Sequence, residues 1–87
     1  MVQPRPSADL RGVASDPVAR AFGAALKQLR EQRKLTQEEL AHRASTSQSY
    51  LSLLEKGRRT PSLATIVLLA RGLRLSATEL VRAYEQQ

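Results

Sequence analysis

The stretch TQEELAHRASTSQSYLSLLEKG, residues 36–57, decides how this chain folds. Thr36 is followed three residues later by Glu39, which is the spacing of a capping box and predicts that a helix begins there. A second helix is expected to begin near Ser47 and to end at Gly57, because glycine readily adopts the left-handed conformation that ends many helices. Too few residues separate the two helices for anything but a turn. The stretch therefore predicts two short helices joined by a tight turn.

Each of these two helices has one apolar face. Leu40 and Ala44 share a face of the first helix, and Leu51 and Leu54 share a face of the second. If the two faces pack together, the start of the second helix points outward. Short donors and free backbone N–H groups at a helix start suit the groove of a nucleic acid. The small polar side chains at this start are Ser47, Gln48, Ser49 and Ser52.

The stretch resembles the helix-turn-helix of the lambda-repressor and Cro family, the regulators also called the xenobiotic-response-element class. The resemblance implies an all-α fold, a compact five-helix bundle whose third helix reads the major groove of double-stranded DNA. It implies a sequence-specific transcriptional regulator. The matching runs are LTQEELA (35–41), SQSYLS (47–52), LEKGRR (54–59) and PSL (61–63), and the resemblance covers about residues 22–81.

Local signals predict the three remaining helices, and the five together form one domain over residues 16–87. The signals are a capping residue before proline, a serine before an apolar run, and a second capping-box spacing. In order, they are Asp16-Pro17 for a helix that runs to about Arg33, Ser62 for a helix with Gly72 near its end, and Ser76 to Glu79 for the last helix.

Residues 1–15 contain prolines, a glycine and mixed charges without helical periodicity. We interpret them as a flexible N-terminal arm. Two hypotheses stay open for this arm. It is either a disordered tail or a segment whose Arg5 and Arg11 contact a DNA groove or backbone.

The composition is compatible with a DNA partner and gives no sign of an enzyme. Lys and Arg number 14 against 8 Asp and Glu, which gives a net charge of +6. Such an excess fits a polyanion and equally fits many basic soluble proteins. The chain has no cysteine, a single histidine, His42, and no glycine-rich phosphate loop. We therefore expect no catalytic activity, no metal and no cofactor.

No apolar run reaches the ~20 residues that a membrane span needs, and the first residues lack the apolar core of a signal peptide. We expect a cytoplasmic protein that associates with the nucleoid through DNA and has no membrane partner. No second domain follows the fifth helix in this sequence, so no small-molecule ligand is expected.

The resemblance assigns base contacts to the outer face of the third helix. A glutamine amide there can both donate to and accept from adenine. Leu53 departs from the family pattern, in which a polar residue is common at this position. Leucine cannot hydrogen-bond but can touch a thymine methyl group, so the base code of a relative does not transfer. The predicted base-contacting residues are Gln48, Ser49, Ser52 and Leu53.

The resemblance also implies phosphate contacts around the same helix. Gln37 lies at a helix start, where the helix dipole favours an anion, or else it faces solvent. Tyr50 either gives its hydroxyl to a phosphate or is a half-buried core aromatic. The cations after the third helix either clamp phosphates or form a solvated charge run. The predicted phosphate-contacting residues are Gln37, Ser47, Tyr50, Lys56, Arg58 and Arg59.

Two sets of contacts between protein groups are also expected. By the resemblance, Arg30 pairs with Glu55 and ties the first helix to the third. The fourth helix is apolar nearly all round, so part of its surface is expected to meet a second subunit. The predicted dimer-interface residues are Leu68, Leu69, Leu73, Leu80 and Tyr84.

Together these observations favour a homodimeric regulator on a palindromic operator, with half-sites about one helical turn (~34 Å) apart. A narrower hypothesis is an autoregulating controller of a restriction–modification operon, since such small family members have a similar length. The alternative is an antitoxin or another protein-interaction module whose DNA binding is secondary. That module would use the apolar fourth helix and the N-terminal arm.

Overall fold

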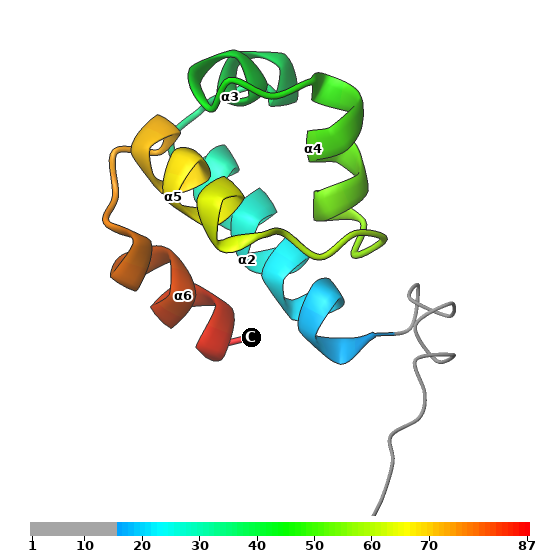
Figure 1. Ribbon diagram of the computed structural model, residues 1–87. Helices are drawn as coiled ribbons and strands as arrows, with labels where there is room; N and C mark the ends of the chain where they lie inside the picture. Colours follow the sequence, from blue (N-terminus) through cyan, green and yellow to red (C-terminus); the bar gives the residue numbers. More distant parts are fainter. Residues whose placement is uncertain (1–15) are drawn as a thin grey trace, which may run out of the picture.

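The computed structural model describes residues 16–87, and these residues fold into a bundle of five helices (Figure 1). Within this described part of the chain no residue lies in a strand, so the predicted all-α fold is confirmed. The predicted arm, residues 1–15 with Arg5 and Arg11, lies outside the described residues. The helices are α2 (Pro17–Gln32), α3 (Gln37–Arg43), α4 (Gln48–Glu55), α5 (Leu63–Gly72) and α6 (Ala77–Glu85).

Each of these helices begins at a side chain that accepts a hydrogen bond from a backbone N–H of the first turn. Both predicted capping boxes are complete, because Glu39 and Glu79 also accept from the backbone N–H of their caps. A cap of this kind stabilises a helix by about 1 kcal/mol. The predicted helix starts are thus confirmed. The capping residues are Asp16, Thr36, Ser47, Ser62 and Ser76.

The end of α4 shows how four of the helices stop. Gly57 has a φ of 74°, in the left-handed region, as its place in the sequence predicted. Its N–H donates to the carbonyl of Leu54, and the N–H of Arg58 donates to the carbonyl of Leu53. The same pair of bonds ends α2, α3 and α5, but there the left-handed residue carries a side chain. Those three residues are Lys34, Ser45 and Arg74.

A glycine also sets the distance between α2 and α4. A Cβ at Gly23 would lie 2.3 Å from the carbonyl oxygen of Leu54 and 2.7 Å from that of Glu55. Real Cβ atoms do not approach oxygen so closely, so only glycine fits there without a shift of one helix. This contact holds the end of α4 directly against α2. The sequence analysis did not assign a role to Gly23.

The core receives side chains from every described helix. α2 packs against α4 and α6, α3 packs against α4 and α5, and α5 packs against α6 (Figure 1). Leucine dominates, with a single aromatic ring, Phe22, among the buried residues. The buried cluster consists of Phe22, Leu26, Leu40, Ala41, Ala44, Leu51, Leu54, Leu69, Ala70, Leu73 and Leu80.

The core corrects the prediction for the dimer interface. Leu69, Leu73 and Leu80 are fully buried within the single chain, so their assignment to a contact with a second subunit is wrong. The physical reason is that α5 packs against both α3 and α6, which covers more than one side of an apolar helix. Of the predicted set, Leu68 is 37% exposed and Tyr84 is half-buried.

Candidate nucleic-acid interface

The predicted helix-turn-helix is formed by α3, a short turn and α4. Ser45 has a φ of 57° in this turn, and the N–H of Thr46 donates to the carbonyl of Ala41 at 2.9 Å. The side chain of Ser47 then accepts from the N–H of Tyr50 and begins α4. The four apolar residues expected between the two helices are all buried, so the start of α4 faces outward.

The outer face of α4 gathers the residues predicted to contact bases. Gln48 and Ser49 are exposed, while Ser52 and Leu53 are half-buried. Residues three and four apart lie on one side of a helix, which explains why these positions meet. A shallow depression joins them to the start of α3 and the end of α4. It is lined by Gln37, Gln48, Ser49, Ser52, Leu53 and Lys56.

A part-buried ion pair joins α2 to the end of α4, next to this depression. Arg30 Nε donates to Glu55 Oε2 at 2.6 Å, and Arg30 Nη2 donates to Glu55 Oε1 at 3.0 Å. The side chains of Arg30 and Glu55 are only 11% and 3% exposed. The pKa of Arg30 is raised above its ordinary value, mainly by the hydrogen bond to Glu55. The pair implied by the family resemblance is therefore present, and it joins α2 to the last residue of α4.

The same carboxylate also holds Gln37. Gln37 Nε2 donates to Glu55 Oε1 at 2.9 Å. A carboxylate only accepts hydrogen bonds, so the amide nitrogen of Gln37 must face Glu55. The amide oxygen and the second N–H then remain for a partner in the depression. Gln37 is thus half-buried and oriented, unlike a helix-start glutamine that simply faces solvent, and the sequence analysis did not foresee this bond.

The cations predicted to contact phosphate lie at the end of the same helix. Lys56, Arg58 and Arg59 are exposed, and within residues 16–87 none of them has a carboxylate within 4.0 Å. Arg59 Cζ lies 5.6 Å from the centroid of the Tyr50 ring, a cation–π distance. Tyr50 is half-buried and packs against the edge of the core. Its ring therefore connects the core to the cationic loop, a contact that the sequence alone did not reveal.

Two features are absent from the part of the chain that the structure describes. Among residues 16–87, no group of three or more His, Asp or Glu side chains is placed to hold a metal ion. In that same part of the chain, no helix is long and apolar enough to cross a membrane.

Comparison with known proteins decides the family. The sequence model of the helix-turn-helix family matches residues 26–80. The chain belongs to this family. The matched range contains the whole of α3, α4 and α5, so the predicted resemblance to regulators of the lambda-repressor and Cro type is confirmed.

Three relatives of this helix-turn-helix protein show the range of the family. The HTH-type transcriptional regulator y4dJ of Sinorhizobium fredii, itself uncharacterised, is 48% identical over 59 residues, which cover 68% of this chain and 77% of y4dJ. The immunity repressor protein of Bacillus phage phi105 is 41% identical over 59 residues, but the chain spans only 41% of that protein. The restriction–modification controller protein C.AhdI of Aeromonas hydrophila has a similar structure, with a TM-score of 0.69 and 37% identity over 71% of this chain and 94% of C.AhdI.

Proposed function

We propose that this protein is a transcriptional regulator that binds a specific sequence of double-stranded DNA. One observation carries the proposal: the depression along α4 combines exposed hydrogen-bonding side chains with the cation Lys56, and two more exposed cations, Arg58 and Arg59, follow α4 in the chain. The relatives support it, because y4dJ is named a transcriptional regulator and the phi105 protein an immunity repressor. The DNA-binding domain would span residues 16–87, and such a regulator acts in the cytoplasm of a bacterium without a cofactor.

The two kinds of residue in this interface have different tasks. The side chains of Gln48, Ser49 and Ser52 line the depression and would read base edges, and the second amide N–H of Gln37 would donate to a phosphate beside them. The exposed cations Lys56, Arg58 and Arg59 neutralise phosphates and so position the helix without reading sequence. The side chain of Ser47 caps α4 by accepting the N–H of Tyr50. The backbone N–H groups before Tyr50 would then be the ones at the helix start that bind a phosphate.

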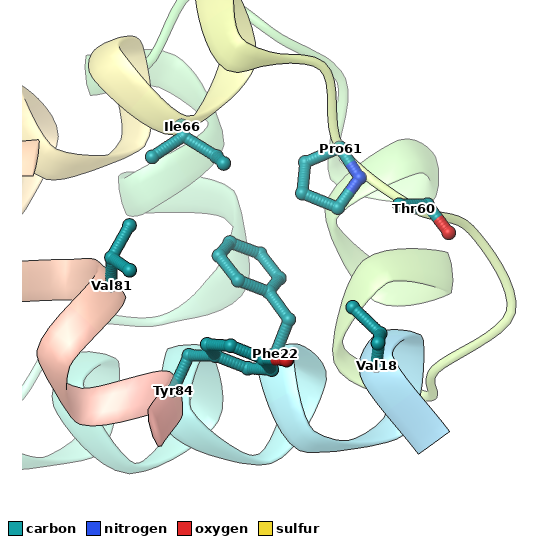
Figure 2. A pocket seen from close by; sticks show the side chains of 7 residues that line it. All are labelled: Val18, Phe22, Thr60, Pro61, Ile66, Val81 and Tyr84. Atoms are coloured by element: carbon teal, nitrogen blue, oxygen red, sulfur yellow. The ribbon is translucent and has the colours of Figure 1, made fainter. Parts of the chain in front are cut away.

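The protein would act as a homodimer on a palindromic operator. The surface available for a second subunit is the apolar one that the core leaves exposed, on α2, α5 and α6. Leu63 is 74% exposed, Val18 is 48% exposed, and Val81, like Leu68, is 37% exposed. Val18 and Val81 also line an apolar pocket (Figure 2). The pocket is lined by Val18, Phe22, Thr60, Pro61, Ile66, Val81 and Tyr84.

Light scattering of the purified protein tests this assembly. We expect a mass twice the 9.6 kDa of one chain. A monomer that stays monomeric on DNA would contradict the homodimer. Copurification of an unlike protein in equal amount would favour an antitoxin or another interaction module instead.

Selection of bound duplexes from random DNA tests the central proposal. We expect an inverted repeat whose half-site centres are about 34 Å apart, since each dimer places two recognition helices one DNA turn apart. Binding without any preferred sequence would contradict the proposal. A matched control is the protein with Gln48→Ala and Ser49→Ala, which should lose the preference but keep the salt-dependent binding of random DNA.

The narrower role is that of an autoregulating controller of a restriction–modification operon, which the similarity to C.AhdI supports. A phage-type repressor is the competing role, supported by the phi105 relative. Binding to the DNA directly upstream of the protein's own gene, in an operon that also encodes a nuclease and a methyltransferase, is the expected result for a controller. A selected site that is absent from that upstream region would contradict autoregulation.

A further inference from the structure

The three leucines of α4 have different surroundings. Leu51 and Leu54 are fully buried in the core. Leu53 is half-buried, is not part of the core cluster, and lines the depression together with Gln48, Ser49, Ser52 and Lys56. It is thus a partly exposed aliphatic side chain among polar neighbours. An aliphatic side chain in that position contributes little to the folded core.

The way that α4 ends does not account for this leucine either. The backbone N–H of Arg58 donates to the carbonyl oxygen of Leu53 at the end of α4. In helix ends of this type, the side chains of these two positions often make an apolar contact. The residue equivalent to Arg58 is Leu35 after α2 and Leu75 after α5, and both pack against the core. After α4 that position is an exposed cation, Arg58, in place of a leucine packed on the core.

The position of Leu53 on α4 points toward DNA. Ser49 lies four residues before it and Lys56 three residues after it, so the three share one face of the helix. Leu53 therefore lies between a small polar side chain and a cation that can meet a phosphate. In the major groove, the apolar group on a base edge is the 5-methyl group of a pyrimidine, which natural DNA carries on thymine and on 5-methylcytosine.

We propose that Leu53 selects a 5-methylpyrimidine in each half-site by packing against its methyl group. This inference rests on the proposed function, because it names one base that the regulator reads. In unmodified DNA this methyl group belongs to thymine, and in methylated DNA 5-methylcytosine carries the same group. Burial of one methyl group favours binding about fourfold.

The experiment uses the full chain and the site obtained from random DNA. Each thymine of one half-site is replaced in turn by uracil, which lacks only the methyl group, and affinity is measured by fluorescence anisotropy. Wild type should bind about fourfold more weakly when one particular thymine is replaced. Leu53→Ala should bind the thymine and uracil duplexes equally, and Leu53→Met, which stays apolar, should keep most of the difference. Replacement of each cytosine by 5-methylcytosine forms the second arm, and a gain that Leu53→Ala abolishes would assign the methyl group to that base.

The outcomes separate this inference from the function on which it rests. If a specific site exists but no uracil or 5-methylcytosine duplex differs from its parent in a Leu53-dependent way, the inference is overturned and the regulator stands. If Leu53→Ala weakens specific and random DNA alike, Leu53 contacts the sugar–phosphate backbone and the inference is likewise overturned. If selection yields no preferred sequence, both fall together. Equal melting temperatures of the three proteins will show that the variants are folded.

Discussion

The outer face of α4 and the exposed surface of α5 and α6 differ in what they present. The first combines short polar side chains with cations, and its one aliphatic side chain is Leu53. The second exposes Leu63, Leu68 and Val81 and includes an apolar pocket that Val81 lines. A polyanion with readable base edges fits the first surface, and an apolar partner such as a second subunit fits the second. The two surfaces therefore suit two different kinds of partner.

The two surfaces also differ in how they are held. The α4 face is supported by a charged network in which Glu55 binds Arg30 and Gln37. The α5–α6 surface is supported mainly by apolar packing, through residues such as Phe22, Leu73 and Leu80. The first support is directional and fixes the orientation of a side chain at the site. The second is non-directional and fixes only a shape.

Removal of the carboxylate at the centre of the network should have the largest effect. Glu55→Ala leaves the part-buried guanidinium of Arg30 with only the carbonyl oxygen of Leu35 as an acceptor, and we expect a loss of about 3 kcal/mol in the free energy of unfolding. Urea denaturation measures this loss. Glu85→Ala removes an exposed carboxylate of α6 and should change stability by less than about 0.5 kcal/mol. Equal effects of the two substitutions would show that the network does not support the α4 face.

Changes on the α4 face itself should separate sequence reading from attraction to phosphate. Gln48→Ala should weaken binding to the selected site by about 1–3 kcal/mol and leave random DNA unaffected. Arg58→Ala should weaken both to the same degree and lower the dependence of affinity on salt. Anisotropy titrations at several salt concentrations measure all four cases. If Gln48→Ala weakened random DNA as much as the selected site, Gln48 would not read bases.

A change on the apolar surface should act on assembly and spare the α4 face. Leu63 is 74% exposed in the single chain, so Leu63→Ser should change the stability of a monomer very little. In a dimer that buries this side chain, the substitution should weaken association by about 1.5 kcal/mol. Sedimentation at decreasing protein concentration measures the dimer dissociation constant. Lys27→Ala, which changes an exposed residue of α2, is the control. Equal dimer dissociation constants for the two variants would show that Leu63 does not lie in the dimer interface.

The sequence predicted most of the fold and of the α4 face because the signals there are local. Thr36 and Glu39 satisfy each other's backbone groups within one turn, and Gly57 takes a conformation that suits glycine. The alternation of polar and apolar residues around Gln48 and Leu51 needs only helical geometry to be interpreted. Each of these features depends on residues a few positions apart.

The features that the sequence did not reveal depend on distant residues. Leu73 and Leu80 are equally apolar in a core and in an interface, and only the packing of α5 against α3 and α6 shows which it is. Gly23 matters because the carbonyls of α4 approach it, and these lie some thirty positions later in the chain. The bond from Gln37 to Glu55 likewise requires the two helices to be placed first.

The smallest predicted effect concerns the residues in the left-handed conformation that follow α2 and α5. Lys34 and Arg74 have φ values of 56° and 62°, which cost a residue with a Cβ more than they cost glycine. Lys34→Gly and Arg74→Gly should each stabilise the protein by about 0.5 kcal/mol, because the relief of strain exceeds the added freedom of the unfolded chain. Thermal unfolding measures both. Since these residues only close helix ends, DNA affinity at high salt and the dimer dissociation constant should not change. A loss of stability in either variant would mean that its side chain contributes more than the backbone strain costs.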